Sequence, residues 1–340
     1  GGTTALIIAA STIDGDLTLI SGNASGITDS DTVTVGGDLA ATTDAGNGVI
    51  NMGTLEVDGT LALTTHGNGA ATVVNDAGIE FAASTVRGAL SATATTGDIT
   101  DSGALAVTGA STFTAADGQS VTLNNTNNFT GTVTFAAASG NLKNVTITDT
   151  TALDLGALAL AQVAGAGGNL TVTTSGALTD SGALVIPGTT TITATGQVVE
   201  LDHTSNNFAT ILFGSSSNAV SSVEVVDTNA IVIGASKSTG NFTVTAGDDV
   251  TDSGTVTVGG NLSVTTSASN GLINMGTLEV DGTIALTTHG NGAATVVNDA
   301  GLNFASSTVG GALSATATIG NIIDSGALAI TGTTTLVTSA

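Results

Sequence analysis

Short runs in which apolar and small polar residues alternate fill most of the chain. Clear examples are residues 32–35, 54–57, 60–63, 132–135 and 242–245. Alternation with a period of two places successive side chains on opposite faces of an extended strand. These runs therefore predict short β-strands whose Val, Ile, Leu, Ala and occasional Phe side chains point inward, while Thr and Ser point outward.

Glycine, asparagine and aspartate separate these runs at intervals that match one turn of a β-helix. Similar turn motifs begin at Gly36 and Asp58, about 22 residues apart, and at Gly240 and Gly260, about 20 residues apart. A unit of this length is too short to fold alone and buries its apolar face only against its neighbours. We therefore predict an all-β protein, a parallel β-helix (β-solenoid) with coils of about 20–22 residues.

Two features interrupt this spacing. The turn motifs at Gly140 and Gly168 lie further apart than one such coil, which predicts an insertion or a longer loop. The single proline, Pro187, occupies the position of Thr108 and Thr331, directly before a glycine. Because proline cannot donate to a strand ladder, this position predicts a corner rather than a strand.

Internal repeats dominate the sequence. Residues 51–78 recur as residues 274–301 with one change, Leu61 to Ile284, so that the repeating period is about 223 residues. Within this super-repeat, an aliphatic-x-Asp-Ser tetrad marks modules that start near residues 27, 99, 178, 250 and 322. We therefore predict one continuous solenoid over residues 1–340, with a super-repeat at 27–249 and a partial second copy at 250–340.

The composition is strongly acidic and moderately apolar. Asp and Glu number 27 against 3 Lys and Arg, for a formal net charge of −24, and cysteine is absent. Nucleic acid is excluded as a partner, because phosphate binding needs clustered cations. No run approaches the ~18 apolar residues of a membrane span, while a hydrophobic content of 41% is too high for disorder. An acidic, cysteine-free chain rich in Thr, Gly and Asn is typical of exported surface proteins, so we expect an extracellular or cell-surface location.

The Gly-Gly/Asn-Leu-x-Val-x-Thr and Gly-x-Leu-x-Val-x-Gly phrases of these coils resemble those of large bacterial exoproteins. The nearest families are filamentous haemagglutinin-like two-partner-secretion proteins and giant β-strand-repeat surface proteins. The resemblance covers the whole chain. It implies a right-handed parallel β-helix, export to the cell surface, and a role in adhesion or filament formation.

No residue pattern predicts a catalytic or cofactor-binding site, and we expect that the protein is not an enzyme. A glycan-active enzyme on this fold would need clustered carboxylates with a nearby cation. The cations Arg87, Lys143 and Lys237 belong to different modules. The three histidines are interpreted as corner or surface residues without partners for a metal site or a triad: His66, His203 and His289.

No metal site is predicted, although calcium is the strongest candidate ligand. The acidic turns Asp14-Gly15-Asp16 and 248–252 offer hard oxygen donors. The calcium-binding nonapeptide pattern is absent, and several acidic residues are not retained in the second copy. The tetrad aspartates are expected instead to cap their own turns with the following serine: Asp29, Asp101, Asp180, Asp252 and Asp324.

The sequence favours a structural role, as an extracellular rod, fibre or stalk segment that assembles with neighbouring repeats or end to end with other copies. Near-identical copies suit a spacer, whereas an active site needs no repetition. The alternatives are an adhesin that binds glycans or other cells, an ice-binding threonine array of the type Thr171-Val172-Thr173, and a polysaccharide-active enzyme.

Overall fold

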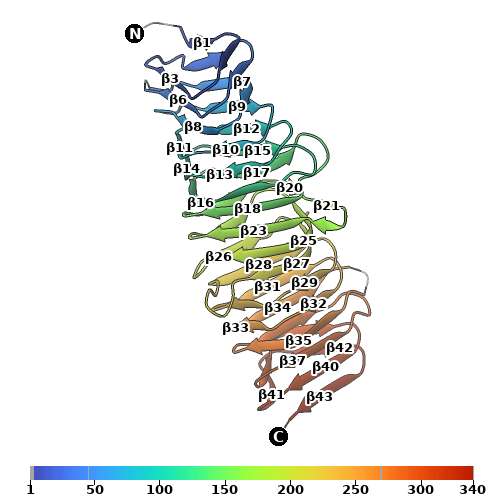
Figure 1. The fold of residues 1–340 in the computed structure, drawn as a ribbon. Coiled ribbons are helices and arrows are strands. Elements are labelled where there is room, and N and C mark those ends of the chain that lie inside the picture. The colour runs from blue at the N-terminus through green and yellow to red at the C-terminus, as the bar shows by residue number, and fades with distance from the viewer. Residues whose placement is uncertain (1–3, 45, 269, 340) are drawn as a thin grey trace. The chain divides into compact units, whose positions relative to one another are not determined.

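The computed structural model describes residues 4–44, 46–268 and 270–339. The chain divides into two compact units, Gly1–Asn169 and Leu170–Ala340. Each unit is a parallel β-solenoid in which strands of successive coils stack on one another (Figure 1). Together the units contain about 16 turns at intervals of about 21 residues, and the described residues form no helix. The predicted fold class is confirmed.

The first unit contains strands β1 to β22. Their bounds are Leu6–Ile8, Ser11–Ile13, Leu17–Ser21, Ile27–Asp29, Val33–Val35, Leu39–Thr43, Ile50–Val57, Thr60–Thr64, Ala71–Asn75, Ile79–Phe81, Ser84–Val86, Leu90–Ala94, Ile99–Asp101, Leu105–Val107, Ser111–Ala115, Val121–Phe129, Val133–Ala137, Asn144–Asp149, Leu153–Leu155, Leu158–Ala159, Gln162–Val163 and Ala166–Gly167. They include the four predicted strands of this region.

The second unit begins inside β23 and continues to β43. The bounds of β23 to β43 are Asn169–Thr174, Leu178–Asp180, Leu184–Thr193, Val198–Leu201, Asn207–Phe213, Ser222–Asp227, Ile231–Ile233, Ser236–Ser238, Phe242–Ala246, Val250–Asp252, Val256–Val258, Leu262–Thr266, Ile273–Val280, Ile284–Thr287, Ala294–Asn298, Leu302–Phe304, Ser307–Val309, Leu313–Ala317, Ile322–Asp324, Leu328–Ile330 and Thr334–Thr338.

A typical coil has two unlike faces. The straight face is one strand of about five residues, such as β6, and the broken face is a pair of three-residue strands, such as β4 and β5. In some coils one long strand with a bulge, such as β7 or β35, covers the broken face. The ladders are parallel, and each strand pairs with the strand one coil further along the chain.

The core is a narrow column of inward side chains. Leu39, Leu61 and Leu63 are at most 1% exposed, and the intervening outward residues are Ala and Thr. Phe113 stacks on Phe135 at 5.8 Å between ring centroids, one coil further on. The predicted division into inward aliphatic and outward small polar residues is confirmed.

The irregular spacing between Gly140 and Gly168 is explained by an insertion, as predicted. Strands β21 and β22 form a small antiparallel hairpin. Its two turn residues, Ala164 and Gly165, have positive φ angles of 53° and 77°, as two-residue hairpin turns require.

Pro187 corrects one prediction. It lies inside β25, not at a corner, and the register of β25 against β27 shifts between Ile186 and Thr189. A bulge frees the proline nitrogen from the ladder, so a proline is tolerated within this strand.

Within the residues that the structure describes, the two faces exchange at four places. There one straight strand follows another, so that a broken face in one coil is covered by a straight strand in the next. The strands that make this change, which we call exchange strands, are β9 and β18 in the first unit and β28 and β37 in the second.

Candidate functional site

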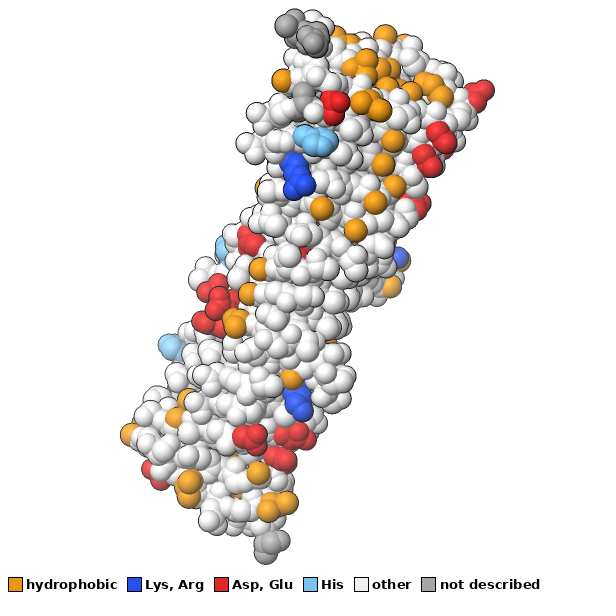
Figure 2. All heavy atoms as spheres, turned by 90° about the vertical axis from the view of Figure 1, so that its left-hand side faces the viewer, with side chains coloured by type: hydrophobic (Ala, Val, Ile, Leu, Met, Phe, Trp, Pro, Cys, Tyr) orange, Lys and Arg blue, Asp and Glu red, His pale blue; other side chains and the backbone are white. Residues whose placement is uncertain are grey.

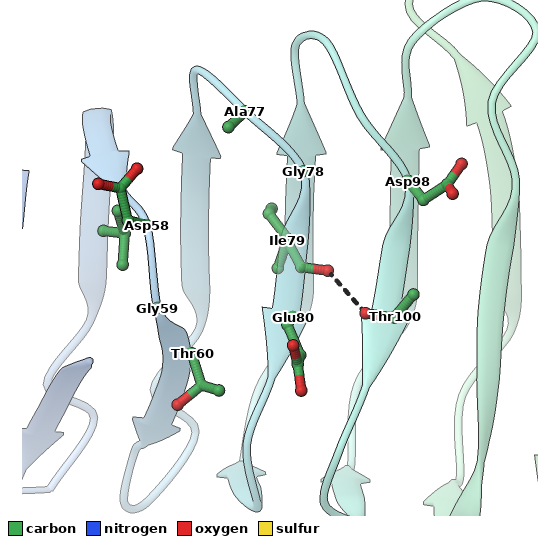
Figure 3. A pocket seen from close by; sticks show the side chains of 10 residues that line it. Asp58, Gly59, Thr60, Ala77, Gly78, Ile79, Glu80, Asp98 and Thr100 are labelled. Atoms are coloured by element: carbon green, nitrogen blue, oxygen red, sulfur yellow. Dashed lines mark hydrogen bonds between the residues drawn. The ribbon is translucent and has the colours of Figure 1, made fainter. Parts of the chain in front are cut away.

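A shallow acidic groove of about 360 Å³ lies at a corner of the first unit (Figure 3). Asp58 and Thr60 line it from one coil, Glu80 from the next, and Asp98 from a third. The pairing of Ala71 with Leu90 shows that the coil that begins at β9 is shorter than its neighbours. The groove lies beside the exchange at β9, because its lining residues precede and follow this strand.

The same groove recurs in the second unit with different charges. Asp281 occupies the place of Asp58, but Asn303 and Asn321 replace Glu80 and Asp98, and the volume is again about 360 Å³. The hollow thus follows from the backbone of the repeat. The acidic side chains do not recur with it.

The groove in the first unit can accept hydrogen bonds but has no cation to stabilise an anion. Its lining contains no Lys, Arg or His. Asp98 accepts a hydrogen bond from the backbone N–H of Ser120 at 2.7 Å, and the Thr100 hydroxyl donates to the Ile79 carbonyl at 3.5 Å. These contacts link coils and do not make an acid–base pair.

A larger groove of about 540 Å³ in the second unit is lined by one cation and one acid. Lys237, Thr257 and Glu279 are in register on three successive coils. The Thr257 hydroxyl donates to Glu279 Oε2 at 2.8 Å. Leu212 and Gly214 contribute to the lining, so the groove is mixed in polarity.

The three histidines lie in separate corners, as predicted from the sequence. His66 and His289 are exposed, and His66 Nδ1 contacts the Thr43 carbonyl. His203 Nδ1 accepts a hydrogen bond from the Ser205 N–H at 3.2 Å and so closes its own turn. Its backbone N–H points to Asp180 Oδ1 at 3.4 Å.

The other two cations, Arg87 and Lys143, lie apart from each other. Arg87 lines a hollow of about 260 Å³ with Thr108 and Asn128. The Lys143 carbonyl accepts a hydrogen bond from Gly168 N at 2.6 Å, at the base of the β21–β22 hairpin. On the face drawn in Figure 2, basic side chains appear as single spots among mainly neutral polar atoms and backbone.

Four of the tetrad aspartates accept backbone N–H groups from the next coil instead of capping their own turns, which corrects the prediction for Asp29, Asp101, Asp180 and Asp252. Asp29 accepts hydrogen bonds from the N–H groups of Gly53 and Thr54, in the bulge of the next coil, at 2.9 and 2.7 Å. Asp252 makes the same contacts with Gly276 and Thr277. The serine that follows the aspartate contacts the preceding coil instead.

Ser102 illustrates this opposite direction, because its hydroxyl donates to the Phe81 carbonyl of the preceding coil at 3.3 Å. The tetrads that start near residues 27 and 99 therefore join three coils: the aliphatic residue fills the core, the aspartate contacts the next coil, and the serine contacts the previous one.

The acidic turns proposed for calcium use their side chains in the same manner. Asp16 Oδ1 accepts the Asp38 N–H at 2.9 Å, and Asp249 Oδ1 accepts the Leu272 N–H at 2.7 Å. Across the part of the chain that the structure describes, no group of three or more His, Asp or Glu side chains is arranged to hold a metal ion.

The last residue of each exchange strand was missed by sequence reasoning. These residues are Asn75 of β9, Asp149 of β18, Asp227 of β28 and Asn298 of β37, and none is more than 3% exposed. A polar residue before a turn predicts an exposed turn residue. The only available signal was two straight runs without a broken run between them, as at residues 60–64 and 71–75.

At the two amide exchange sites, the asparagine replaces a missing ladder partner. Asn75 Oδ1 accepts the Val57 N–H at 2.8 Å, while Nδ2 donates to the carbonyls of Val57 at 3.1 Å and Gly78 at 2.8 Å. Asn298 makes the equivalent contacts with Val280 and Gly301.

At the two carboxylate exchange sites, an aspartate makes only acceptor contacts. Asp149 accepts the N–H groups of Phe129 at 2.7 Å and Thr151 at 2.5 Å. Asp227 accepts those of Phe208 at 2.5 Å and Asn229 at 2.7 Å.

The modules that contain the carboxylate exchange sites also contain a buried asparagine that donates to the tetrad aspartate. Asn127 Nδ2 donates to Asp101 at 2.8 Å, and Asn206 Nδ2 donates to Asp180 at 2.6 Å.

Burial raises the pKa of Asp149 and of Asp227 above the ordinary value of 3.8, although hydrogen bonds from neighbouring N–H groups oppose the change. Burial likewise raises the pKa of Asp180, to which the charge of Asp202 adds a smaller effect. Loss of water disfavours the charged form of a carboxyl group. The opposite holds at an exposed corner, where hydrogen bonds from Thr60 lower the pKa of Asp38.

This chain is a repeat protein of the β-solenoid class, because hydrogen bonds join its stacked coils and the same groove recurs in two copies with different charges. The chain belongs to the family described as repeats of unknown function (DUF5649), whose model matches residues 68–136, 142–213, 220–274 and 291–340. Successive matches start at intervals close to the module spacing in the sequence. No curated protein and no solved structure matched the chain. None of the described residues forms a helix able to cross a membrane.

Proposed function

We propose that this chain is a structural segment of a repetitive extracellular protein, a rod or stalk that acts through length and stiffness. The observation that carries this proposal is the comparison of the two corner grooves. The hollow and the inter-coil contacts recur from one copy of the super-repeat to the next, whereas the side chains that could support chemistry change. Such a pattern suits a scaffold better than an active site.

The high acidic charge, the absence of cysteine and the resemblance to β-helical bacterial exoproteins support the extracellular location. Membership of a repeat family supports the spacer role. The likeness to filamentous haemagglutinin-like proteins, the handedness and one continuous solenoid over residues 1–340 stay predictions.

Small-angle X-ray scattering of the purified protein tests the rod. About 16 turns at ~4.8 Å per turn would give a particle roughly 75 to 80 Å long with a constant cross-section. A compact particle, or one in which the two units move independently, would contradict a stiff spacer. Electron microscopy would show whether particles also join end to end.

Limited proteolysis gives a second test. Trypsin has three possible cleavage sites, Arg87, Lys143 and Lys237. Each lies in or beside a strand of a ladder, so the folded chain is expected to stay intact while a urea-unfolded sample is cut. Rapid cutting of the folded chain would count against the proposal.

One observation favours a second function, binding to ice or another regular hydroxyl-rich surface. On straight strands of the first unit, the outward residues Thr72, Ser91, Thr112 and Thr134 are in register over four coils. The neighbouring column is interrupted by Val74 and Ala136, which weakens a flat array.

A thermal-hysteresis assay, with Thr112→Lys as the disrupting variant, separates this function from a spacer. Activity that the variant loses would support the ice-binding array. Specific binding on a glycan array would support an adhesin instead.

A further inference from the structure

The four exchange sites share a backbone arrangement but differ in one functional group. Asn75 and Asn298 carry an amide, whereas Asp149 and Asp227 carry a carboxyl group. In both kinds, one side-chain oxygen accepts a backbone N–H from the preceding coil, as Val57 donates to Asn75 and Phe129 donates to Asp149. The chain therefore contains a natural comparison between an amide and a carboxyl group in equivalent buried positions.

We propose that the two carboxylate exchange sites bind protons and hold their coils together more firmly in weakly acidic than in alkaline solution. The two amide exchange sites do not respond to pH over this range. Acid thus strengthens two of the four places at which the faces of the solenoid exchange.

The geometry provides the reason. An ionised carboxylate at a site at most 3% exposed has lost most of its water, and each acid receives only a few hydrogen bonds in return. Binding one proton from solvent removes the charge. In the amide sites, Nδ2 donates to the carbonyl of Val57 or Val280. By analogy, a protonated Asp149 or Asp227 would donate to the carbonyl of Phe129 or Phe208, the residue whose N–H group it accepts.

The direction of the pKa changes supports this mechanism. Because the folded-state pKa of both aspartates is raised, the folded chain binds more protons than the unfolded chain between the two pKa values. The resulting stability is fully present below the unfolded value of 3.8 and is lost as the pH rises through the folded pKa.

Other titratable or charged groups lie on the surrounding elements. Those around Asp149 are Asp101, Lys143 and Asp154, and those around Asp227 are Asp180, Glu200, Asp202, His203, Glu224 and Asp248. Burial also raises the pKa of Asp180, which accepts a hydrogen bond from Asn206 Nδ2. A test must therefore separate the exchange sites from the general acidity of the chain.

Amide hydrogen exchange with residue resolution, measured from pH 4 to pH 8 and corrected for intrinsic rates, makes this separation within one molecule. The protection of the Phe129 and Phe208 amides should fall with rising pH relative to that of the Val57 and Val280 amides. The expected change in this ratio is about tenfold for each unit by which the pKa is raised. An equal pH dependence of all four amides would overturn the proposal.

Variants give an independent test. In Asp149→Asn/Asp227→Asn, the pH dependence of the Phe129 and Phe208 amides should disappear. The matched control Asp58→Asn/Asp281→Asn removes two charges from exposed corners and should leave it in place. If the pH dependence persisted in the first variant, or disappeared in the control, Asp149 and Asp227 would not be its source and the proposal would be refuted. If the first variant does not fold, the comparison within the wild-type chain still decides.

Discussion

Two kinds of module build this chain, and they differ most where the solenoid changes face. The modules that start near residues 27 and 250 end their exchange strands with an asparagine that both donates and accepts. Those that start near residues 99 and 178 end with an aspartate and also contain a buried asparagine, Asn127 or Asn206, that donates to the tetrad aspartate. The backbone solution is the same in both. The difference teaches that the repeat preserves a hydrogen-bond acceptor at this position and leaves its charge free to vary.

The largest effect is expected from removing an amide exchange site. Asn75→Ala leaves the N–H and C=O of Val57 and the C=O of Gly78 without their partner inside the core. Loss of these contacts should lower the free energy of unfolding by about 2–4 kcal/mol, measured by urea denaturation. The adjacent exposed residue provides the control, Asp76→Ala, which should change little. Equal stability of the two variants would show that the amide is not needed.

A second variant converts one kind of module into the other. Asn75→Asp introduces a buried carboxyl group at an amide exchange site, and stability at pH 8 should fall by about 1–3 kcal/mol. Most of the loss should be recovered as the pH is lowered toward 4, because the protonated acid is neutral. Thermal unfolding across this range measures the effect, and Asn75→Gln controls for altered packing. A loss that is the same at every pH would contradict the comparison.

The carboxylate modules also contain unpartnered hydroxyl groups in the core. Ser111 and Thr190 are fully buried, and neither hydroxyl oxygen has a hydrogen-bond partner. Leu39 and Leu262 occupy the equivalent positions of the amide modules. Ser111→Val and Thr190→Val should each stabilise the fold, by about 1 kcal/mol. The control Thr112→Val, on the outward side of the strand that contains Ser111, should not stabilise the fold. Destabilisation by both core variants would indicate that these hydroxyls have partners.

The smallest effect is expected at an exposed corner and has the opposite sign. Asp38 Oδ1 accepts hydrogen bonds from the N–H and hydroxyl of Thr60, which lower the pKa of Asp38. The stability from this contact is present above the unfolded pKa and is lost as the pH falls through the folded pKa.

Asn261 makes the same contacts with Thr283 through a neutral amide. Hydrogen exchange of the Thr60 amide should therefore become faster in acid relative to that of Thr283, after correction for intrinsic rates. The variant Asp38→Asn should abolish this difference, and a difference that remained would point to another group.

The sequence by itself determined the fold class, the coil length, the super-repeat that begins at residue 27 and again at residue 250, and the insertion between Gly140 and Gly168. Each of these follows from local rules: period-two alternation assigns the inward side chains, and Gly and Asn mark the corners. The same rules identified Asp29 and its equivalents as recurrent turn residues, but they assigned the wrong partner.

Only the tertiary structure decided which coil each polar side chain contacts. The carboxylate of Asp29 accepts amides from the next coil, those of Gly53 and Thr54, and Asn75 is buried because a straight strand covers a broken one. These contacts depend on how successive coils stack, and a one-coil pattern of apolar and polar residues does not encode that register. An asparagine or aspartate before a turn therefore has the same local signature whether it lies in water or closes the core.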